Sequence, residues 1–267
     1  MGERLKVVLY TFESPVTLAI ADRLIATGKL SAVILQTPMT WRGKAAFLRR
    51  RLGRYGLFRV VDEILFKIFY TLFLKRADDR VRMTLAFDRG VSKERLEHQI
   101  EVHETDSLNS ASGRDLLRRL QPDHVIMMSR EMIRGETLGA ARLGFVGCHP
   151  GLLPEYRGVY APFWALKAGR PDQVGLTVYL ANRGVDTGPL ISERALGPRF
   201  GLRHFKIESE RLMLEGVQDL IDAVERAERG SLTTYTKPDA ESRLYSHVGL
   251  THYLCALKRG SVPTATP

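Results

Sequence analysis

The sequence predicts an α/β fold in which a mostly parallel, twisted sheet carries helices on both faces, as in Rossmann-like folds. Short apolar runs rich in Val, Ile and Leu alternate with helical patterns along the chain. These runs are too short for buried helices, which indicates strands. The chain has 267 residues and 44% hydrophobic residues, enough to bury a sizeable core in one large domain, or in one domain with a small appendage.

Seven apolar runs are predicted to be strands. They are LKVVLYTF (5–12), SAVILQT (31–37), IEVHET (100–105), DHVIMMS (123–129), LGFVGCHP (143–150), VGLTVYLA (174–181) and PLISERAL (189–196). A first helix is expected after Ser14, which caps it, with Pro15 at its first position and Gly28 past its end. A second occupies 113–122, and a long helix covers roughly 203–229.

Residues 41–87 interrupt this alternation with a basic helical insertion. Between Arg42 and Arg82 there are twelve Lys or Arg and four acidic residues, a net charge of +8, whereas the whole chain carries +10. Apolar residues recur there at spacings of three and four, in a wide stripe that needs a partner surface. The stripe consists of Leu57, Val60, Val61, Ile64, Leu65, Ile68, Phe69, Leu72 and Phe73.

Two interpretations of this insertion remain open, and they are compatible. The insertion either packs on the sheet with a solvated basic face, or it contacts an anionic membrane surface or the diphosphate of a substrate. A single basic block favours a local acidic partner over nucleic acid, because the rest of the molecule is close to neutral.

Several function classes lack their usual sequence signals. The two cysteines lie far apart without a CxxC, which predicts a reducing compartment and no structural metal. No GxGxxG follows the first strand and no GxxxxGK[ST] occurs, so dinucleotide and P-loop binding are unsupported. The first residues do not resemble a secretory signal, and no apolar run is long enough to cross a bilayer. We therefore expect a cytoplasmic protein, at most peripheral to the inner face of a membrane.

The stretch GCHPGLLPEYRG (147–158) places a histidine where a catalytic group is expected. In a strand, Gly147 and His149 share one face while Cys148 points to the other, where it is interpreted as a small buried hydrophobe. His149 then stands at the carboxyl end of its strand, which is where open α/β sheets form their ligand crevice.

A second loop, NRGVDTGP (182–189), follows the next predicted strand and holds Asp186 between two glycines. A histidine and a carboxylate brought together from two strand ends can act as a general base and its charge-stabilising partner. Transfer of an acyl group to an amine needs such a pair, because the amine must lose a proton as it attacks.

Residues 147–191 closely resemble the formyltransferase fold family, whose members transfer a one-carbon unit from N10-formyltetrahydrofolate to an amine. The family pattern is Asn-x-His-Pro, then Leu-Leu/Thr-Pro-x-Tyr-Arg-Gly, and later Gly-x-Asp-Thr-Gly. Weaker similarity extends to LKVVLYTF, the helix after it and residues 120–133. The resemblance implies N10-formyltetrahydrofolate as co-substrate and no metal.

The resemblance also implies roles for individual residues. His149 matches the family's catalytic histidine and Asp186 its catalytic aspartate. Arg157 and Gly158 match the loop that shapes the mouth of the active site, and Tyr160, just after it, is a candidate for lining the acceptor pocket. The loop at 127–133 and the loop of Asp186 match segments that contact folate. Their candidate folate-binding residues are Met128, Ser129, Met132, Ile133, Val185 and Asp186.

The position of the family's catalytic asparagine is occupied by Gly147. That asparagine would donate a hydrogen bond to the formyl oxygen, and losing one such donor typically costs about 10²–10³-fold in rate. Three explanations remain open. Water or another side chain uses the open space beside Gly147; the acceptor or donor differs, with glycine making room; or catalysis is lost and binding retained.

The resemblance favours an amino sugar, or a nucleotide-linked amino sugar, as the amine acceptor. Members that formylate initiator tRNA carry an additional C-terminal barrel, for which the last part of this chain is too short, so no tRNA partner is expected. We expect a catalytic domain at 1–200 that includes the insertion, and a C-terminal helix and tail at 201–267 packed on it. The oligomeric state is left open. The alternatives are a catalytically impaired folate- or sugar-binding or membrane-associated scaffold on the same fold, and a formyl-folate hydrolase.

Overall fold

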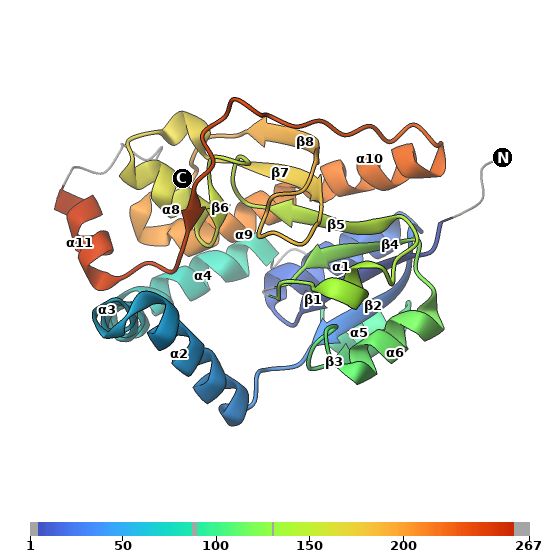
Figure 1. Cartoon of the computed structure of the whole chain (residues 1–267), viewed down its shortest axis with the longest axis horizontal. Helices are drawn as coiled ribbons and strands as arrows, with labels where there is room; N and C mark the ends of the chain where they lie inside the picture. The colour runs from blue at the N-terminus through green and yellow to red at the C-terminus, as the bar shows by residue number, and fades with distance from the viewer. Residues whose placement is uncertain (1–4, 87–89, 130, 259–267) are drawn as a thin grey trace.

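The protein, seen as a computed structural model, is built on one seven-stranded sheet with the strand order β3-β2-β1-β4-β5-β7-β8 (Figure 1). The structure describes residues 5–86, 90–129 and 131–258, so the tail at 259–267 and residue 87 of the predicted insertion lie outside it. The strands are β1 (Val7–Phe12), β2 (Leu30–Gln36), β3 (Glu101–Thr105), β4 (His124–Met128), β5 (Gly144–His149), β7 (Gly175–Leu180) and β8 (Leu190–Ala195). The first five of these pair in parallel, whereas β7 runs antiparallel to both β5 and β8. The predicted mostly parallel α/β sheet is confirmed.

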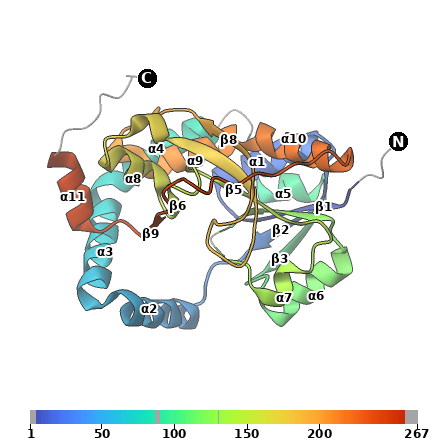
Figure 2. The same cartoon turned by 45° about the horizontal axis from the view of Figure 1, so that its top comes forward.

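Helices cover both faces of the sheet, as Figure 2 shows. Alternate residues of β1 feed two separate cores: Val7 and Leu9 belong to the larger one, and Val8 and Tyr10 to the smaller one. α6 (Ala111–Leu120) and α7 (Gly135–Leu138) lie over the smaller core. Over the larger core lie α1 (Pro15–Ala26), α4 (Lys75–Ala86), α5 (Lys93–Glu97), α8 (Ala161–Lys167), α9 (Phe205–Glu215), α10 (Val217–Glu228) and α11 (Leu250–Lys258).

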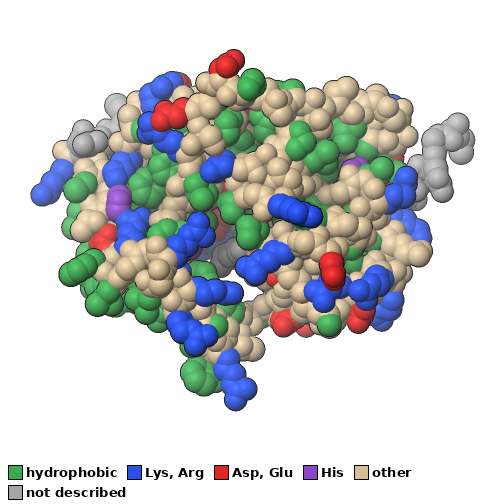
Figure 3. All heavy atoms as spheres, in the orientation of Figure 1, with side chains coloured by type: hydrophobic (Ala, Val, Ile, Leu, Met, Phe, Trp, Pro, Cys, Tyr) green, Lys and Arg blue, Asp and Glu red, His purple; other side chains and the backbone are tan. Residues whose placement is uncertain are grey.

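The insertion forms α2 (Trp41–Tyr55), α3 (Leu57–Phe69), a short π-helical turn η1 (Tyr70–Leu74) and α4. Its core-facing side is not the predicted stripe. The side chains that α3 and η1 bury are Val60, Phe66, Tyr70 and Leu74, whereas most of the stripe faces solvent. Hydrophobic side chains accordingly gather over α3 at the molecular surface, beside the Lys and Arg of α2 (Figure 3). No helix in the described part of the chain is long and apolar enough to cross a bilayer.

Aromatic packing and a buried polar cluster decide which side of the insertion turns inward. The ring of Phe66 lies 5.2 Å from that of Tyr253 and 6.0 Å from that of Phe205. The Tyr70 hydroxyl donates to the fully buried carboxylate of Asp78 at 2.7 Å, and His204 reaches the other oxygen of Asp78 at 2.6 Å.

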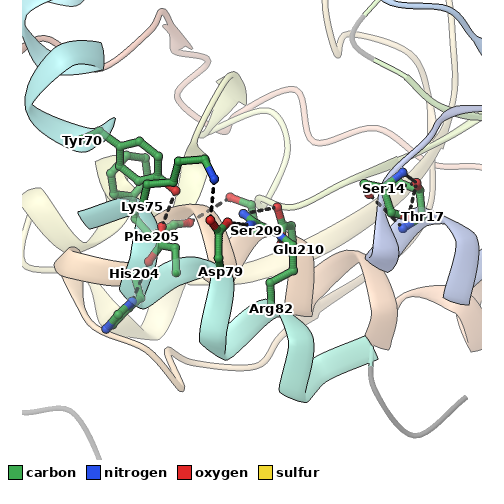
Figure 4. A network of polar contacts seen from close by, with 11 residues as sticks. Ser14, Thr17, Tyr70, Lys75, Asp79, Arg82, His204, Phe205, Ser209 and Glu210 are labelled. Atoms are coloured by element: carbon green, nitrogen blue, oxygen red, sulfur yellow. Dashed lines mark hydrogen bonds and ion pairs between the residues drawn. The ribbon is translucent and has the colours of Figure 1, made fainter. Parts of the chain in front are cut away.

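An ion pair lies beside this polar cluster: Arg82 Nε donates to Glu210 Oε2 at 2.8 Å (Figure 4). Phe205 and Glu210 belong to α9, His204 directly precedes α9, and Tyr253 belongs to α11. These contacts fasten the insertion to the helical layer and not to the sheet. The sequence could not predict which side of the insertion turns inward, because its partners on α9, on α11 and just before α9 lie more than a hundred residues away along the chain.

Two helix boundaries test the sequence signals. α1 begins as predicted, since the Ser14 hydroxyl accepts from the Thr17 N–H at 3.2 Å and the Thr17 hydroxyl accepts from the Ser14 N–H at 3.1 Å (Figure 4). The single helix expected at 203–229 is wrong, because α9 and α10 are separated at Gly216. A Cβ at Gly216 would lie 2.8 Å from the Cys148 sulfur, so a glycine lets this turn sit directly on β5.

Candidate active site

His149 is the last residue of β5, and the β5 arrow points toward the side of the molecule that holds α8 and the insertion (Figure 1). His149 is 6% exposed, and its Nε2 lies 2.7 Å from the backbone oxygen of Tyr156. A carbonyl oxygen only accepts, so Nε2 carries a hydrogen and the neutral ring keeps its lone pair on Nδ1. Gly151 leaves room for this ring, because a Cβ there would lie 2.9 Å from Nε2.

Asp186 brings its carboxylate to the free side of that ring. Oδ2 lies 3.7 Å from His149 Nδ1, which is a charge contact too long for a hydrogen bond. The same Oδ2 accepts from the Gly158 N–H at 2.8 Å, and Oδ1 accepts from the Tyr179 hydroxyl at 2.7 Å. The structure thus brings together the two side chains that the sequence singled out, and fixes the carboxylate with two donors.

The loop of Asp186 is shaped by residues that suit a tight turn. Asp186 has a positive φ of 50°, in the left-handed region that aspartate tolerates better than most residues. Asn182 closes the loop by accepting from the Gly184 N–H at 2.9 Å and from the Thr187 hydroxyl at 2.7 Å. A Cβ at Gly188 would overlap the backbone oxygen of Leu180, so only glycine fits where the chain returns to β8.

Arg157 and Gly158 form β6 (Arg157–Gly158), which pairs in parallel with β9 (Leu244–Tyr245). Gly158 has φ of 95°, and a Cβ there would lie 2.1 Å from the Tyr245 backbone oxygen. The glycine therefore permits the strand contact that aims its N–H at Asp186. The Nε of Arg157 is buried and has no hydrogen-bond partner among the described residues.

The expected open space beside Gly147 does not exist. A Cβ at Gly147 would lie 2.5 Å from the ring of Tyr179, which faces it across the antiparallel β5–β7 pair. Burial, and next the charge of Asp186, raise the pKa of the Tyr179 hydroxyl well above its usual value, so it remains a proton donor to that carboxylate. Sequence reasoning missed Tyr179, because only the strand register places it opposite Gly147.

The predicted folate loop is divided between core and surface. Met128 and Ile133 are buried, whereas Met132 is exposed and Ser129 is half-buried. Arg130, inside this loop, lies outside the described residues.

Glu131 is a residue of this loop that the sequence did not single out. Its carboxylate accepts from the hydroxyl of Tyr10 at 2.7 Å, from the N–H of Leu108 at 3.1 Å and from the Asn109 amide at 2.8 Å. It thereby ties the loop to the carboxyl end of β1. No pattern in the sequence marks it.

The remaining candidates lie around these loops. Val185 is exposed beside Asp186. Tyr160 packs edge-on against Phe205 at 5.0 Å and against His247 at 6.0 Å, with its ring half-buried. Trp164, in α8, is buried in the larger core.

Cys148 occupies the opposite face of β5 from His149, as the strand alternation predicts. It is buried in the larger core, and burial raises the pKa of its thiol to about 12. A thiol that stays protonated is a poor nucleophile, so Cys148 is a packing residue.

Comparison with known proteins identifies the segment that carries these loops. Residues 78–197, which include His149 and Asp186, match the family model described as formyl transferase. The chain thus carries a segment, a little less than half of its length, that is similar to the formyl transferase family. The methionyl-tRNA formyltransferases of Thermotoga maritima and Aromatoleum aromaticum are 28% and 30% identical to this chain. Those alignments cover 51% and 57% of this chain, and 43% and 47% of the relatives. The chain thus spans less than half the length of the two relatives.

Solved structures show that the formyltransferase fold extends over nearly the whole chain. Glycinamide ribonucleotide transformylase 1 from Symbiobacterium toebii has a TM-score of 0.56 and 19% identity, with 92% of this chain and 96% of that chain covered. A sugar N-formyltransferase from a Shewanella species has a TM-score of 0.56 and 10% identity, with 96% and 88% covered. An N-formyltransferase from Helicobacter canadensis, in complex with folinic acid and dTDP-3-aminofucose, has a TM-score of 0.53 and 9% identity, with 90% and 70% covered. At these identities the likeness concerns the fold alone.

Proposed function

We propose that this protein transfers a formyl group from N10-formyltetrahydrofolate to the amine of an amino sugar, in particular one linked to a nucleotide diphosphate. The observation that carries the proposal is the contact of His149 Nδ1 with the doubly anchored carboxylate of Asp186, 3.7 Å apart, inside the segment that matches the family. That pair has the chemistry that acyl transfer to an amine requires.

In this mechanism His149 Nδ1 takes a proton from the amine as its nitrogen bonds to the formyl carbon. Asp186 then stabilises the imidazolium, whose Nε2–H remains directed at the Tyr156 carbonyl. The bond between the formyl carbon and N10 breaks, and the proton held by His149 passes to N10, which gives tetrahydrofolate and returns the imidazole to its neutral form. The products are the N-formyl amine and tetrahydrofolate.

Tyr179 acts in this scheme as a positioning residue. Its only hydroxyl proton is directed at Asp186, so in this arrangement it holds the carboxylate and does not replace the missing asparagine as a donor to the formyl oxygen. We expect this site, which has one donor fewer to the formyl oxygen, to turn over about 10²–10³-fold more slowly than a site that has the asparagine. For this reason the assay must also distinguish hydrolysis of formyl-folate and binding without turnover.

The residues around the pair fit the two substrates. Exposed apolar side chains at Met132 and Val185 suit an aromatic pterin, and the unpartnered Nε of Arg157 suits an anionic or carbonyl oxygen. Lys and Arg side chains also stand along the rim of the hollow between α2 and the sheet (Figure 3). Cations at that rim would attract the diphosphate of a nucleotide-linked sugar.

The test is turnover of the full chain with N10-formyltetrahydrofolate and a panel of nucleotide-linked amino sugars, followed as release of tetrahydrofolate. His149→Ala should lower kcat at least 100-fold, because it removes the base. His98→Ala, at an exposed histidine, is the matched control and should leave kcat unchanged.

Each outcome of this assay assigns a different function. Release that depends on an amino sugar supports the proposal, whereas equal release without any amine indicates a hydrolase. Binding of folinic acid without release indicates a binding protein. Full activity of a folded His149→Ala variant would show that His149 is not the base.

A further inference from the structure

The solvent side of α3 and η1 carries a continuous apolar surface, here called the outer apolar face. It consists of Leu57, Phe58, Val61, Ile64, Leu65, Ile68, Leu72 and Phe73, all exposed. Phe58 is 93% exposed, and Leu57, Leu72 and Phe73 are each more than 60% exposed. The face extends over about 24 Å at the rise of an α-helix. Contiguous apolar surfaces of this kind mark interaction sites, because water disfavours them.

This face is not the spare side of an ordinary amphipathic helix. The opposite side of the same segment is apolar as well and is buried through Val60, Phe66, Tyr70 and Leu74. A helix whose inner side already holds it to the protein gains no folding stability from a second apolar side. Among the described residues nothing covers the outer apolar face, so it needs a partner beyond them.

The charges around the face indicate the chemistry of that partner. Eight exposed cations of the insertion have no ion-pair partner among the described residues; they are Arg42, Lys44, Arg49, Arg50, Arg54, Lys67, Arg76 and Arg80. Its four carboxylates are all engaged within the protein: Asp62 by Thr251, Glu63 by Arg51, Asp78 by Tyr70, and Asp79 by Lys75 and Arg82. The exposed surface of the insertion is thus apolar and positive, with no free acid to balance it.

A second copy of this chain fits that surface poorly, because it would set cation against cation with no carboxylate of the insertion free to pair. A protein partner would need a matching concavity, since Phe58 projects almost fully from the surface. A fluid lipid interface needs no matching shape: it takes apolar side chains at the acyl boundary and cations at the headgroup phosphates.

We propose that the outer apolar face docks on an anionic phospholipid surface, with α3 lying along the interface and the cations of the insertion on the headgroups. This inference goes beyond the proposed transfer reaction and does not depend on it. It places the protein at a membrane surface.

The test is sedimentation of the full chain with vesicles of phosphatidylcholine alone and with vesicles that contain about one-third phosphatidylglycerol, at low and high salt. We expect binding to the anionic vesicles only, weakened at high salt because screening reduces the cationic contribution. Phe58→Ser/Leu72→Ser should lower the vesicle partition coefficient at least tenfold, because it removes two apolar side chains from the interface. Lys67→Gln/Arg76→Gln should lower it too, and should flatten its salt dependence.

Leu143→Ser is the matched control at an exposed leucine outside the insertion, and should bind like the unmodified protein. Because the test measures binding, its result is independent of any turnover. Equal binding of the unmodified chain and of Phe58→Ser/Leu72→Ser would overturn the proposal. So would self-association in sedimentation velocity that this variant abolishes, which would assign the face to a second copy. Binding to polyglutamate but not to vesicles would assign the surface to an acidic protein.

Discussion

The ring of Tyr179 packs directly against Gly147 in the candidate site. A Cβ at Gly147 would lie 2.5 Å from the ring of Tyr179. We expect Gly147→Ala to lower the free energy of unfolding by about 1–3 kcal/mol, the usual cost of overpacking. Urea unfolding measures this cost.

Variants of Tyr179 show whether its ring causes the loss of stability in Gly147→Ala. Tyr179→Phe keeps the ring, so Gly147→Ala should cost as much in that background. Tyr179→Ala removes the ring, and the cost of Gly147→Ala should then fall to near zero. An unchanged cost in the Tyr179→Ala background would show that the ring does not fill the space beside Gly147.

At this scale the sequence predicted that His149 and Asp186 would meet, but not the other contacts of the site. His149 and Asp186 could be found because each ends or follows an apolar run and is flanked by turn-forming residues. Tyr179 could not be found, because its role depends on the antiparallel pairing of β5 with β7. A run of apolar residues does not reveal strand direction.

The break between α9 and α10 is an element-scale feature with its own test. Gly216→Ala would gain helix propensity but would bring a Cβ to 2.8 Å from the Cys148 sulfur. We expect the packing cost to exceed the gain, so the melting temperature should fall.

The double variant Gly216→Ala/Cys148→Ala tests whether the Cys148 sulfur causes this packing cost. Removing the sulfur leaves space for the new methyl group, so Gly216→Ala should be neutral or stabilising in a Cys148→Ala background. A fall in melting temperature of the same size in both backgrounds would contradict the packing explanation. Thermal unfolding of the unmodified protein and these three variants completes the cycle.

Elements were predicted well where a single period governs them. The strands follow from short β-rich runs, and the start of α1 follows from Ser14 and Pro15. The stripe on α3 and η1 was identified correctly as apolar, but its sequence left open which side packs inward, because this segment is apolar on both sides. Aromatic partners on α9 and α11 chose the buried side.

The whole molecule should lose stability in mild acid because of a buried histidine of the sheet. His124 in β4 is buried, and burial lowers the pKa of its imidazole. The folded state thus favours the neutral ring, so its contribution is complete above the unfolded pKa of about 6.5 and is lost as pH falls through the lower folded pKa. The free energy of unfolding should therefore be smaller at pH 5.5 than at pH 7.5.

His124→Asn tests this linkage. Asparagine keeps a donor for the Gly144 carbonyl, which lies 3.2 Å from His124 Nδ1, but cannot titrate. Urea unfolding should show a shallower fall between the two pH values in His124→Asn, while His98→Asn should fall like the unmodified protein. Some fall should persist, because burial also lowers the pKa of His252. Identical slopes in His124→Asn and the unmodified protein would contradict the assignment.

The sequence by itself determined the α/β fold class, the positions of the strands, and the two loops that carry His149 and Asp186, because these depend on local periodicity and on turn-forming residues. Tertiary structure alone decided that Tyr179 fills the place beside Gly147, that Gly216 divides a helix, and that the outer apolar face is turned to solvent. Each of those outcomes is set by partners distant in sequence, whose register and packing no local pattern specifies.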